Sequence, residues 1–202
     1  MATHTWVDLQ ISEAELLADL AGVAWDFRSA REFAQLLARE CSPAYTNQEL
    51  VEPLSIAALV MYSRPFMTGV RRRLTDDYLQ ILTPRQREKH RHLRAYRDKH
   101  TAHSVNSFEE NIPRANYCVE RVKDEGITSI SHGGGRVIGL SDEDIQSIVE
   151  LSTILERAVR ANIEEEAARI LPIVRAMPLE KVLAGGQKVF RPNSARAARK
   201  RI

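Results

Sequence analysis

Residues 97 to 104 read RDKHTAHS and place several side chains capable of phosphate and acid–base chemistry in one short stretch. Arg97 carries a guanidinium whose fork matches two phosphate oxygens, and His100 and His103 carry imidazoles that can exchange protons near pH 7. Asp98 could orient either kind of group. The plain alternative is a polar stretch of helix that faces water.

The segment around this stretch, residues 85 to 103, is strongly basic, although the whole chain has a net charge of only +2. Residues 85 to 92 include no apolar side chain, so we expect this part to be solvated or bound to a charged partner rather than held by burial. Clustered cations suit the phosphates of RNA, and histidines between them suit proton transfer. The sequence therefore predicts that Arg91, Arg94 and Lys99 bind nucleic acid.

Other kinds of site are weaker. Four histidines gather between residues 90 and 103, but the cations among them oppose a metal ion, and no second segment supplies the usual zinc ligands. The stretch HGGGR at 132–136 lacks the GxxxxGK[ST] form of a phosphate loop and is typical of a hairpin turn. No GxSxG nucleophile motif is present. We expect neither a metal nor a cofactor.

Helical spacing of apolar residues predicts α-helix for most of the chain. The expected helices begin near Ser12, Arg28, Thr46 or Asn47, Thr83 and Ser141. Thr83 followed by proline, and Ser141 followed by three acids, are strong start signals. The helix from Arg28 is expected to end at about residue 41, and Pro172 is expected to end or kink the last helix.

Between the helix from Thr83 and the helix from Ser141, the apolar period changes to two. The segments NYCVERV, GITSIS and RVIGL predict three short strands, with turns at KDEG and HGGG. The fold class is thus a mainly α-helical bundle with a small antiparallel β insertion at about 115–140. One domain is expected over 1–185, followed by a basic, disordered tail over 186–202.

The cysteine content and the absence of apolar runs indicate the compartment. Cys41 and Cys118 form no CxxC pair, and the first residues do not resemble a signal peptide. No apolar run approaches the roughly 20 residues that a membrane helix needs. These features predict a cytoplasmic protein without membrane contact.

The stretch YRDKHTAHS resembles the signature of HEPN domains, helical proteins with an arginine, usually a polar residue after it, and a histidine four to six residues later. Arg97, Asp98 and His103 fit that form better than other arginine–histidine pairs here. The flanking LVMYSRPF (59–66) and HSVNSFEEN (103–111) resemble the branch related to abortive-infection proteins. The resemblance covers about residues 10–112, and the β insertion departs from the plain HEPN-like bundle.

The resemblance implies a metal-independent endoribonuclease that forms a homodimer and serves as a toxin or in phage defence, with an antitoxin protein as a further partner. Arg97 would stabilise the scissile phosphate, and Asp98 would orient Arg97 or His103. His103 would transfer protons, with His100 as a second proton carrier. Side chains six residues apart lie about 120° apart on a straight helix. We therefore expect the helix to bend or end near Thr101, or two protomers to combine.

Two alternatives remain open at this point. A non-catalytic, HEPN-like module would bind nucleic acid or protein through the same basic surface without cutting. A structural helical dimer with a solvated polar helix would have no affinity for nucleic acid.

Overall fold

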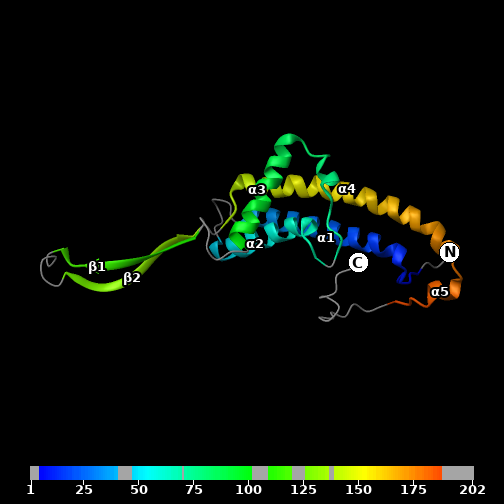
Figure 1. The fold of residues 1–202 in the computed structure, drawn as a ribbon, viewed down its shortest axis with the longest axis horizontal. Helices are drawn as coiled ribbons and strands as arrows, with labels where there is room; N and C mark the ends of the chain where they lie inside the picture. The colour runs from blue at the N-terminus through cyan, green and yellow to red at the C-terminus, as the bar shows by residue number, and fades with distance from the viewer. Residues whose placement is uncertain are drawn as a thin grey trace.

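The computed structural model describes residues 5–40, 47–69, 71–101, 109–119, 126–136 and 139–187. Within these ranges the chain forms five α-helices and one two-stranded antiparallel sheet (Figure 1). In chain order they are α1 (Glu15–Glu40), α2 (Gln48–Ser63), α3 (Pro84–Thr101), β1 (Glu109–Tyr117), β2 (Ile127–Arg136), α4 (Asp142–Arg175) and α5 (Leu179–Leu183). The predicted fold class, mainly helical with a small antiparallel β insertion, is confirmed. None of the described helices combines the length and the apolar character needed to cross a membrane.

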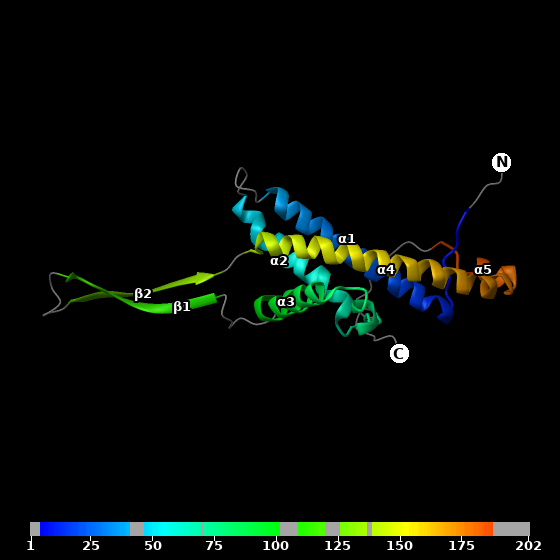
Figure 2. The ribbon, with the colours of Figure 1, turned by 90° about the horizontal axis from the view of Figure 1, so that it is seen from above.

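The core lies between α1 and α4, which run side by side in opposite directions (Figures 1 and 2). Both helices present an apolar stripe at helical spacing, and α2 closes the core from a third side. The fully buried residues include Phe27, Ala30, Ala34, Ala58, Leu59, Tyr62, Ile148, Leu151, Leu155 and Val159. The alanines let the neighbouring backbones approach closely, so the two long helices form a rigid platform for the rest of the chain.

The structure corrects the prediction of two helices in the first forty residues. After a short 3₁₀ turn at Ser12–Ala14, α1 runs without a break to Glu40. Asp26 lies just before the predicted second start, but its carboxylate contacts Arg64 and Arg71 instead of capping a new helix. Because no proline or cap interrupts the chain there, the two apolar stretches belong to one helix.

The two strongest predicted helix starts are confirmed. At α3, the Gln86 backbone N–H donates to Thr83 Oγ1 (3.3 Å) and the Thr83 N–H donates to Gln86 Oε1 (2.9 Å). At α4, the Asp144 N–H donates to Ser141 Oγ (3.1 Å). Each bond satisfies a backbone donor that the first helical turn leaves unpaired. At the other end, α4 passes through Pro172 and ends three residues later.

The prediction of three strands separated by an HGGG turn was wrong. The sheet has two strands, and the HGGG segment lies inside β2, where His132 pairs with Pro113 and Gly133 with Ile112. Space requires glycine at position 134, where a β-carbon would overlap the carbonyl oxygen of residue 110, whereas a β-carbon at position 133 would only displace the Arg114 guanidinium that lies across it. Of the predicted third strand, Arg136 ends β2 and residues 139–140 are not in a strand, while residues 137–138 lie outside the described part of the chain.

The hairpin and the helices are buried to very different extents. Figures 1 and 2 both show β1 and β2 extending away from the helices. Ile130 and Tyr117 keep 73% and 62% of their surface exposed, although a buried strand pair would cover such side chains. The predicted disordered tail falls almost wholly beyond residue 187, outside the described residues.

Candidate nucleic-acid interface on α3

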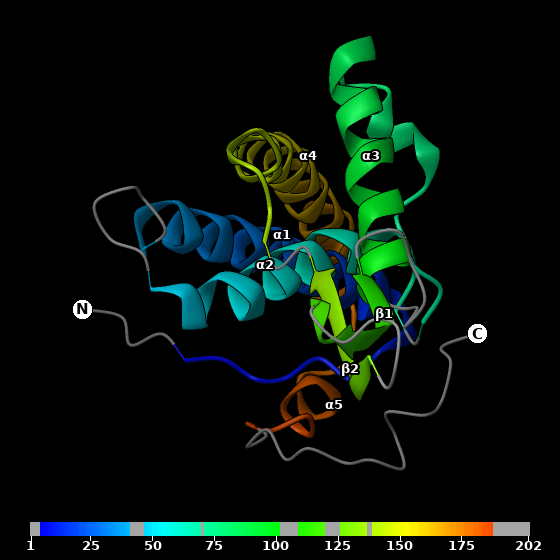
Figure 3. The same ribbon diagram turned by 90° about the vertical axis from the view of Figure 1, so that its left-hand side faces the viewer.

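Helix α3 crosses the direction of α4. Figure 3 looks nearly along the axis of α4 and shows α3 from the side. One side of α3 faces the core with His90, Leu93 and Tyr96. A second side faces α4, and a third faces the segment that contains the 3₁₀ turn Asp76–Leu79. Because the basic residues are distributed over these sides, their charges have different surroundings.

On the side that faces α4, two of the three basic side chains, Lys89 and His92, lie against carboxylates, whereas Arg85 forms no ion pair with a described residue. Lys89 Nζ lies 3.4 Å from Glu150 Oε2, and His92 Nε2 lies 2.9 Å from Asp144 Oδ1. Gln86 donates a hydrogen bond of 2.7 Å to Glu150. That bond, together with the charge of Lys89, lowers the pKa of the Glu150 carboxyl below its ordinary value. This side therefore fastens α3 to α4.

The expectation that burial plays no part in residues 85–92 was wrong because of His90. Its imidazole is 2% exposed and lies edge-on to Phe66, with ring centroids 4.6 Å apart. The Tyr62 hydroxyl and His90 Nδ1 share a hydrogen bond of 2.8 Å. Burial, reinforced by the charge of Arg94, lowers the pKa of His90 to about 4, so the ring is neutral at pH 7.

The third side of α3 lines a hollow of about 440 Å³, which we call the α3 pocket. Its lining residues are Asp76, Leu79, Arg87, His90, Arg91, Arg94, Ala95 and Asp98. The members from α3 follow the three- and four-residue spacing of one helix face. The sequence therefore places three guanidiniums along one side of a pocket, with a neutral imidazole between them.

The arginines of the α3 pocket are electrostatically available. Within the described part of the chain, Arg87, Arg91 and Arg94 form no ion pair. The Arg94 guanidinium carbon lies 5.8 Å from the centre of the Phe66 ring, a contact that steadies the cation without neutralising it. Such groups can bind an anion without first losing a carboxylate partner.

Some of the predicted site residues line the α3 pocket and others do not. Arg91 and Arg94 line the α3 pocket, and Lys99 is exposed on the same helix. Arg97 does not line the pocket, but its Nη1 lies 3.1 Å from Asp98 Oδ1, and Asp98 does line it. These contacts connect the predicted arginine to the edge of the pocket.

Arg97, the first residue of the predicted motif, is largely covered by the protein. The Nε atom of Arg97 is buried and has no hydrogen-bond partner among the described residues, and the side chain as a whole is only 21% exposed. His103 lies two residues after the end of α3, outside the described residues. His100 lies one residue before that end, and its side chain is also outside the described part of the chain. Their convergence with Arg97 stays a prediction.

Sequence reasoning missed Arg87 and His90, which line the α3 pocket, and Tyr62, which shares a hydrogen bond with His90. A signal for His90 was present, because it lies three residues before the apolar Leu93, a spacing that places both side chains on one face of a helix. A polar residue at such a position needs a buried partner. That the partner is Tyr62 of α2 follows only from the tertiary packing.

No protein-family model, no curated protein and no solved structure matches this chain. The candidate interface therefore stands on its own residues and their contacts.

Proposed function

We propose that the protein binds RNA on α3 and cleaves it by metal-independent, HEPN-type chemistry. The observation that carries this proposal is the α3 pocket, in which three arginines without ion pairs to described residues lie beside the Arg97–Asp98 pair. Salt-sensitive binding of a polyanion is the property expected of such a surface. A toxin or phage-defence role, with an antitoxin as partner, belongs to the same proposal.

The proposed reaction uses the RNA's own nucleophile. His103 accepts the proton of the 2′-hydroxyl, the 2′-oxygen attacks the phosphorus, and the bond to the 5′-oxygen breaks. The leaving oxygen takes a proton from an imidazole, for which His100 is the second candidate. Arg97, oriented by Asp98, stabilises the charge that develops on the phosphate. The products are a 2′,3′-cyclic phosphate and a 5′-hydroxyl, and a homodimer would bring Arg97 of one protomer to His103 of the other.

A second candidate function is RNA binding without cleavage. One observation favours it: the arginines that line the α3 pocket are Arg87, Arg91 and Arg94, whereas Arg97 lies outside the pocket. In this alternative the α3 surface holds phosphates, and the histidines have no role in catalysis.

Cleavage of a labelled mixed-sequence RNA in the presence of a chelator tests the proposal. We expect wild-type protein to leave 2′,3′-cyclic phosphate ends, and Arg97→Ala and His103→Ala each to lower the rate by about 10²-fold or more. Arg85→Ala and His92→Ala, which change the α4-facing side of the same helix, are the matched controls and should retain activity.

The outcomes separate the two candidates. Wild-type protein that cleaves no faster than the Arg97→Ala, His103→Ala double variant rules out the nuclease. Salt-sensitive RNA binding that survives the loss of His103 then supports the binding module.

A further inference from the structure

A second arginine-lined hollow, of about 270 Å³, lies between α1 and the segment that follows α2. We call it the α1 pocket. Its lining includes Arg64, Arg71 and Arg72, with Val23, Pro65 and Met67 as apolar neighbours. None of the described residues that line it is an aspartate or a glutamate. The α3 pocket, by contrast, includes two carboxylates among its arginines.

The buried carboxylate of Asp26 on α1 orients two of these arginines. This carboxylate is only 3% exposed, contacts Arg71 through Oδ2, and lies 3.4 Å from Arg64 Nη1 through Oδ1. One carboxylate shared by two guanidiniums leaves a net positive charge at the pocket. Two cations held by a single anion are therefore prepared to receive a second anion.

Gly22 gives a second indication that the position of Arg71 matters. A β-carbon at position 22 would overlap the Arg71 guanidinium, which crosses α1 at that point. Glycine inside a helix costs about 1 kcal/mol relative to alanine. The space that glycine leaves allows Arg71 to lie against the helix and reach Asp26.

Arg72 contributes a third cation whose side chain is less constrained. Its backbone N–H donates to Asp19 Oδ2 (3.2 Å), while its exposed side chain forms no ion pair with a described residue. Its charge contributes to the lowered pKa of Glu166, but that carboxylate is already hydrogen-bonded to Arg169. Counting Asp26 and Asp19 against the three arginines leaves one positive charge.

We propose that the α1 pocket binds a phosphate group, with Arg64 and Arg71 as the preset donors and Arg72 as the mobile one. The guanidinium fork matches phosphate oxygens in pairs, which favours phosphate over a simple halide ion. The apolar lining could cover the group that carries the phosphate. That group is either a free nucleotide or the backbone of an RNA strand.

The RNA source has structural support from Phe66. Its chain neighbours Pro65 and Met67 line the α1 pocket, and its own ring lies beneath Arg94 of the α3 pocket. Both pockets therefore lie close to Phe66, and we infer that a strand bound on α3 could place a further phosphate in the α1 pocket. In that form the inference extends the proposed function, but phosphate binding itself does not depend on cleavage.

The experiment uses the full chain and two neighbouring charge reversals. Arg72→Glu places a carboxylate in the pocket, whereas Arg73→Glu makes the same change one residue away, at an exposed position that does not line it. Inorganic phosphate, 5′-AMP and single-stranded RNAs of increasing length are titrated by calorimetry. We expect Arg72→Glu to weaken binding at least about tenfold, and Arg73→Glu to change it far less.

The probes distinguish the two sources of phosphate. If Arg72→Glu loses affinity for phosphate or 5′-AMP and Arg73→Glu does not, the pocket binds a free nucleotide. If Arg72→Glu loses affinity only for RNA, the pocket binds the RNA backbone. Thr68→Asp adds a carboxylate to the lining without removing an arginine, and should reproduce the loss. Equal affinities of the two arginine variants for every probe would overturn the proposal. A failed RNA-cleavage assay would leave it standing, because no probe needs to be cut.

Discussion

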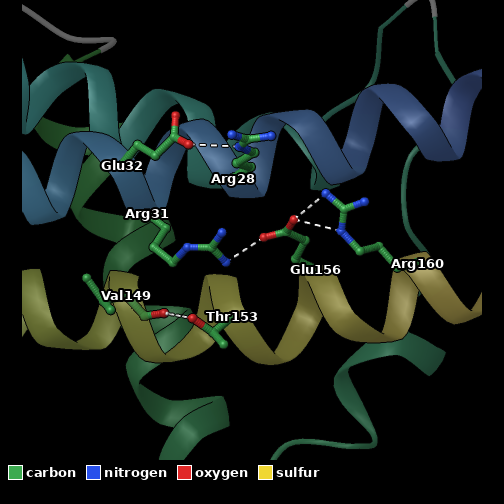
Figure 4. A network of polar contacts seen from close by, with 7 residues as sticks. All are labelled: Arg28, Arg31, Glu32, Val149, Thr153, Glu156 and Arg160. Carbon is green, nitrogen blue, oxygen red and sulfur yellow. Dashed lines mark hydrogen bonds and ion pairs between the residues drawn. The ribbon is translucent and has the colours of Figure 1, made fainter.

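The α1–α4 interface and the α3 pocket both contain arginines, but the arginines differ in whether they have carboxylate partners. Between α1 and α4, Glu156 receives Arg31 at 2.5 Å and Arg160 at 2.7 Å, and its side chain is only 7% exposed (Figure 4). In the α3 pocket, Arg91 and Arg94 have no such carboxylate among the described residues. The first group of charges is satisfied inside the protein, and the second is the group that we propose binds RNA.

The difference shows how structural charges can be distinguished from functional charges in one chain. A buried carboxylate without its arginines would be costly, so the α1–α4 network contributes to holding the helices in register. Unpaired arginines on a surface contribute little to folding, and their mutual repulsion opposes it slightly. Their clustering on one face of α3 is then better explained by binding than by stability.

The largest expected effect is at Glu156. Replacing it by alanine removes the carboxylate that Arg31 and Arg160 share, and leaves the partly buried Arg31 guanidinium beside the exposed Arg160 without a counter-charge. We expect the free energy of unfolding to fall by about 3 kcal/mol, as measured by urea denaturation. A loss below about 1 kcal/mol would mean that the network is not structural, and would weaken the comparison.

The next effect is a pH dependence caused by His90. Since burial lowers its pKa to about 4, the unfolded chain protonates this histidine between pH 6.5 and pH 4 while the folded chain does not. The free energy of unfolding should therefore decrease by about 2 kcal/mol from pH 7.5 to pH 5. Urea denaturation at the two pH values measures the difference.

The control for this prediction is His90→Gln, which keeps a polar side chain but cannot titrate. The groups around His90 are the Tyr62 hydroxyl, which burial keeps protonated, and the charges of Arg91, Arg94 and Asp76. An equal decrease in wild type and His90→Gln would contradict the burial of a neutral imidazole.

Tyr62→Phe should have a smaller effect. The substitution removes the hydroxyl that shares a 2.8 Å hydrogen bond with His90 Nδ1, while the ring still packs against Phe27 and Phe66. We expect a loss of about 1–2 kcal/mol in the free energy of unfolding, because the buried Nδ1 is left without this partner. An unchanged midpoint of thermal unfolding would show that the hydrogen bond is dispensable.

The smallest effect is expected at the exposed pair Arg28–Glu32 on α1. The atoms lie 2.8 Å apart, but both side chains are about half exposed, at 49% and 55%. Glu32→Ala should therefore change the free energy of unfolding by less than about 0.5 kcal/mol in the same urea assay. A change as large as that of Glu156→Ala would show that pairing alone, and not burial, determines the structural role.

The sequence predicted the parts of the fold that depend on local signals. Thr83 and Ser141 identified two helix starts, because capping needs only the residues of one turn. The HGGG segment misled, because three glycines are equally compatible with a turn and with a strand in which Arg114 needs space. The identity of the opposing side chain is not a local property.

The same distinction applies to the candidate site. The basic side chains of α3 were evident from composition, and Arg91 and Arg94 do line a pocket. Which cations stay free depended on α4, whose Glu150 and Asp144 pair with Lys89 and His92 but reach no arginine of the pocket. The pairing of Lys89 and His92 thus depends on the tertiary packing of α3 against α4, which the sequence of α3 does not show.

The salt dependence of RNA binding tests the central claim most directly. Fluorescence anisotropy with a labelled single-stranded RNA would compare Arg91→Gln, which removes an arginine of the α3 pocket, with Arg28→Gln, which removes one paired with Glu32. The slope of log affinity against log salt should shrink by about 0.7 for Arg91→Gln and stay unchanged for Arg28→Gln. Equal slopes for both variants would contradict the claim that the free arginines on α3 are the ones that hold phosphate.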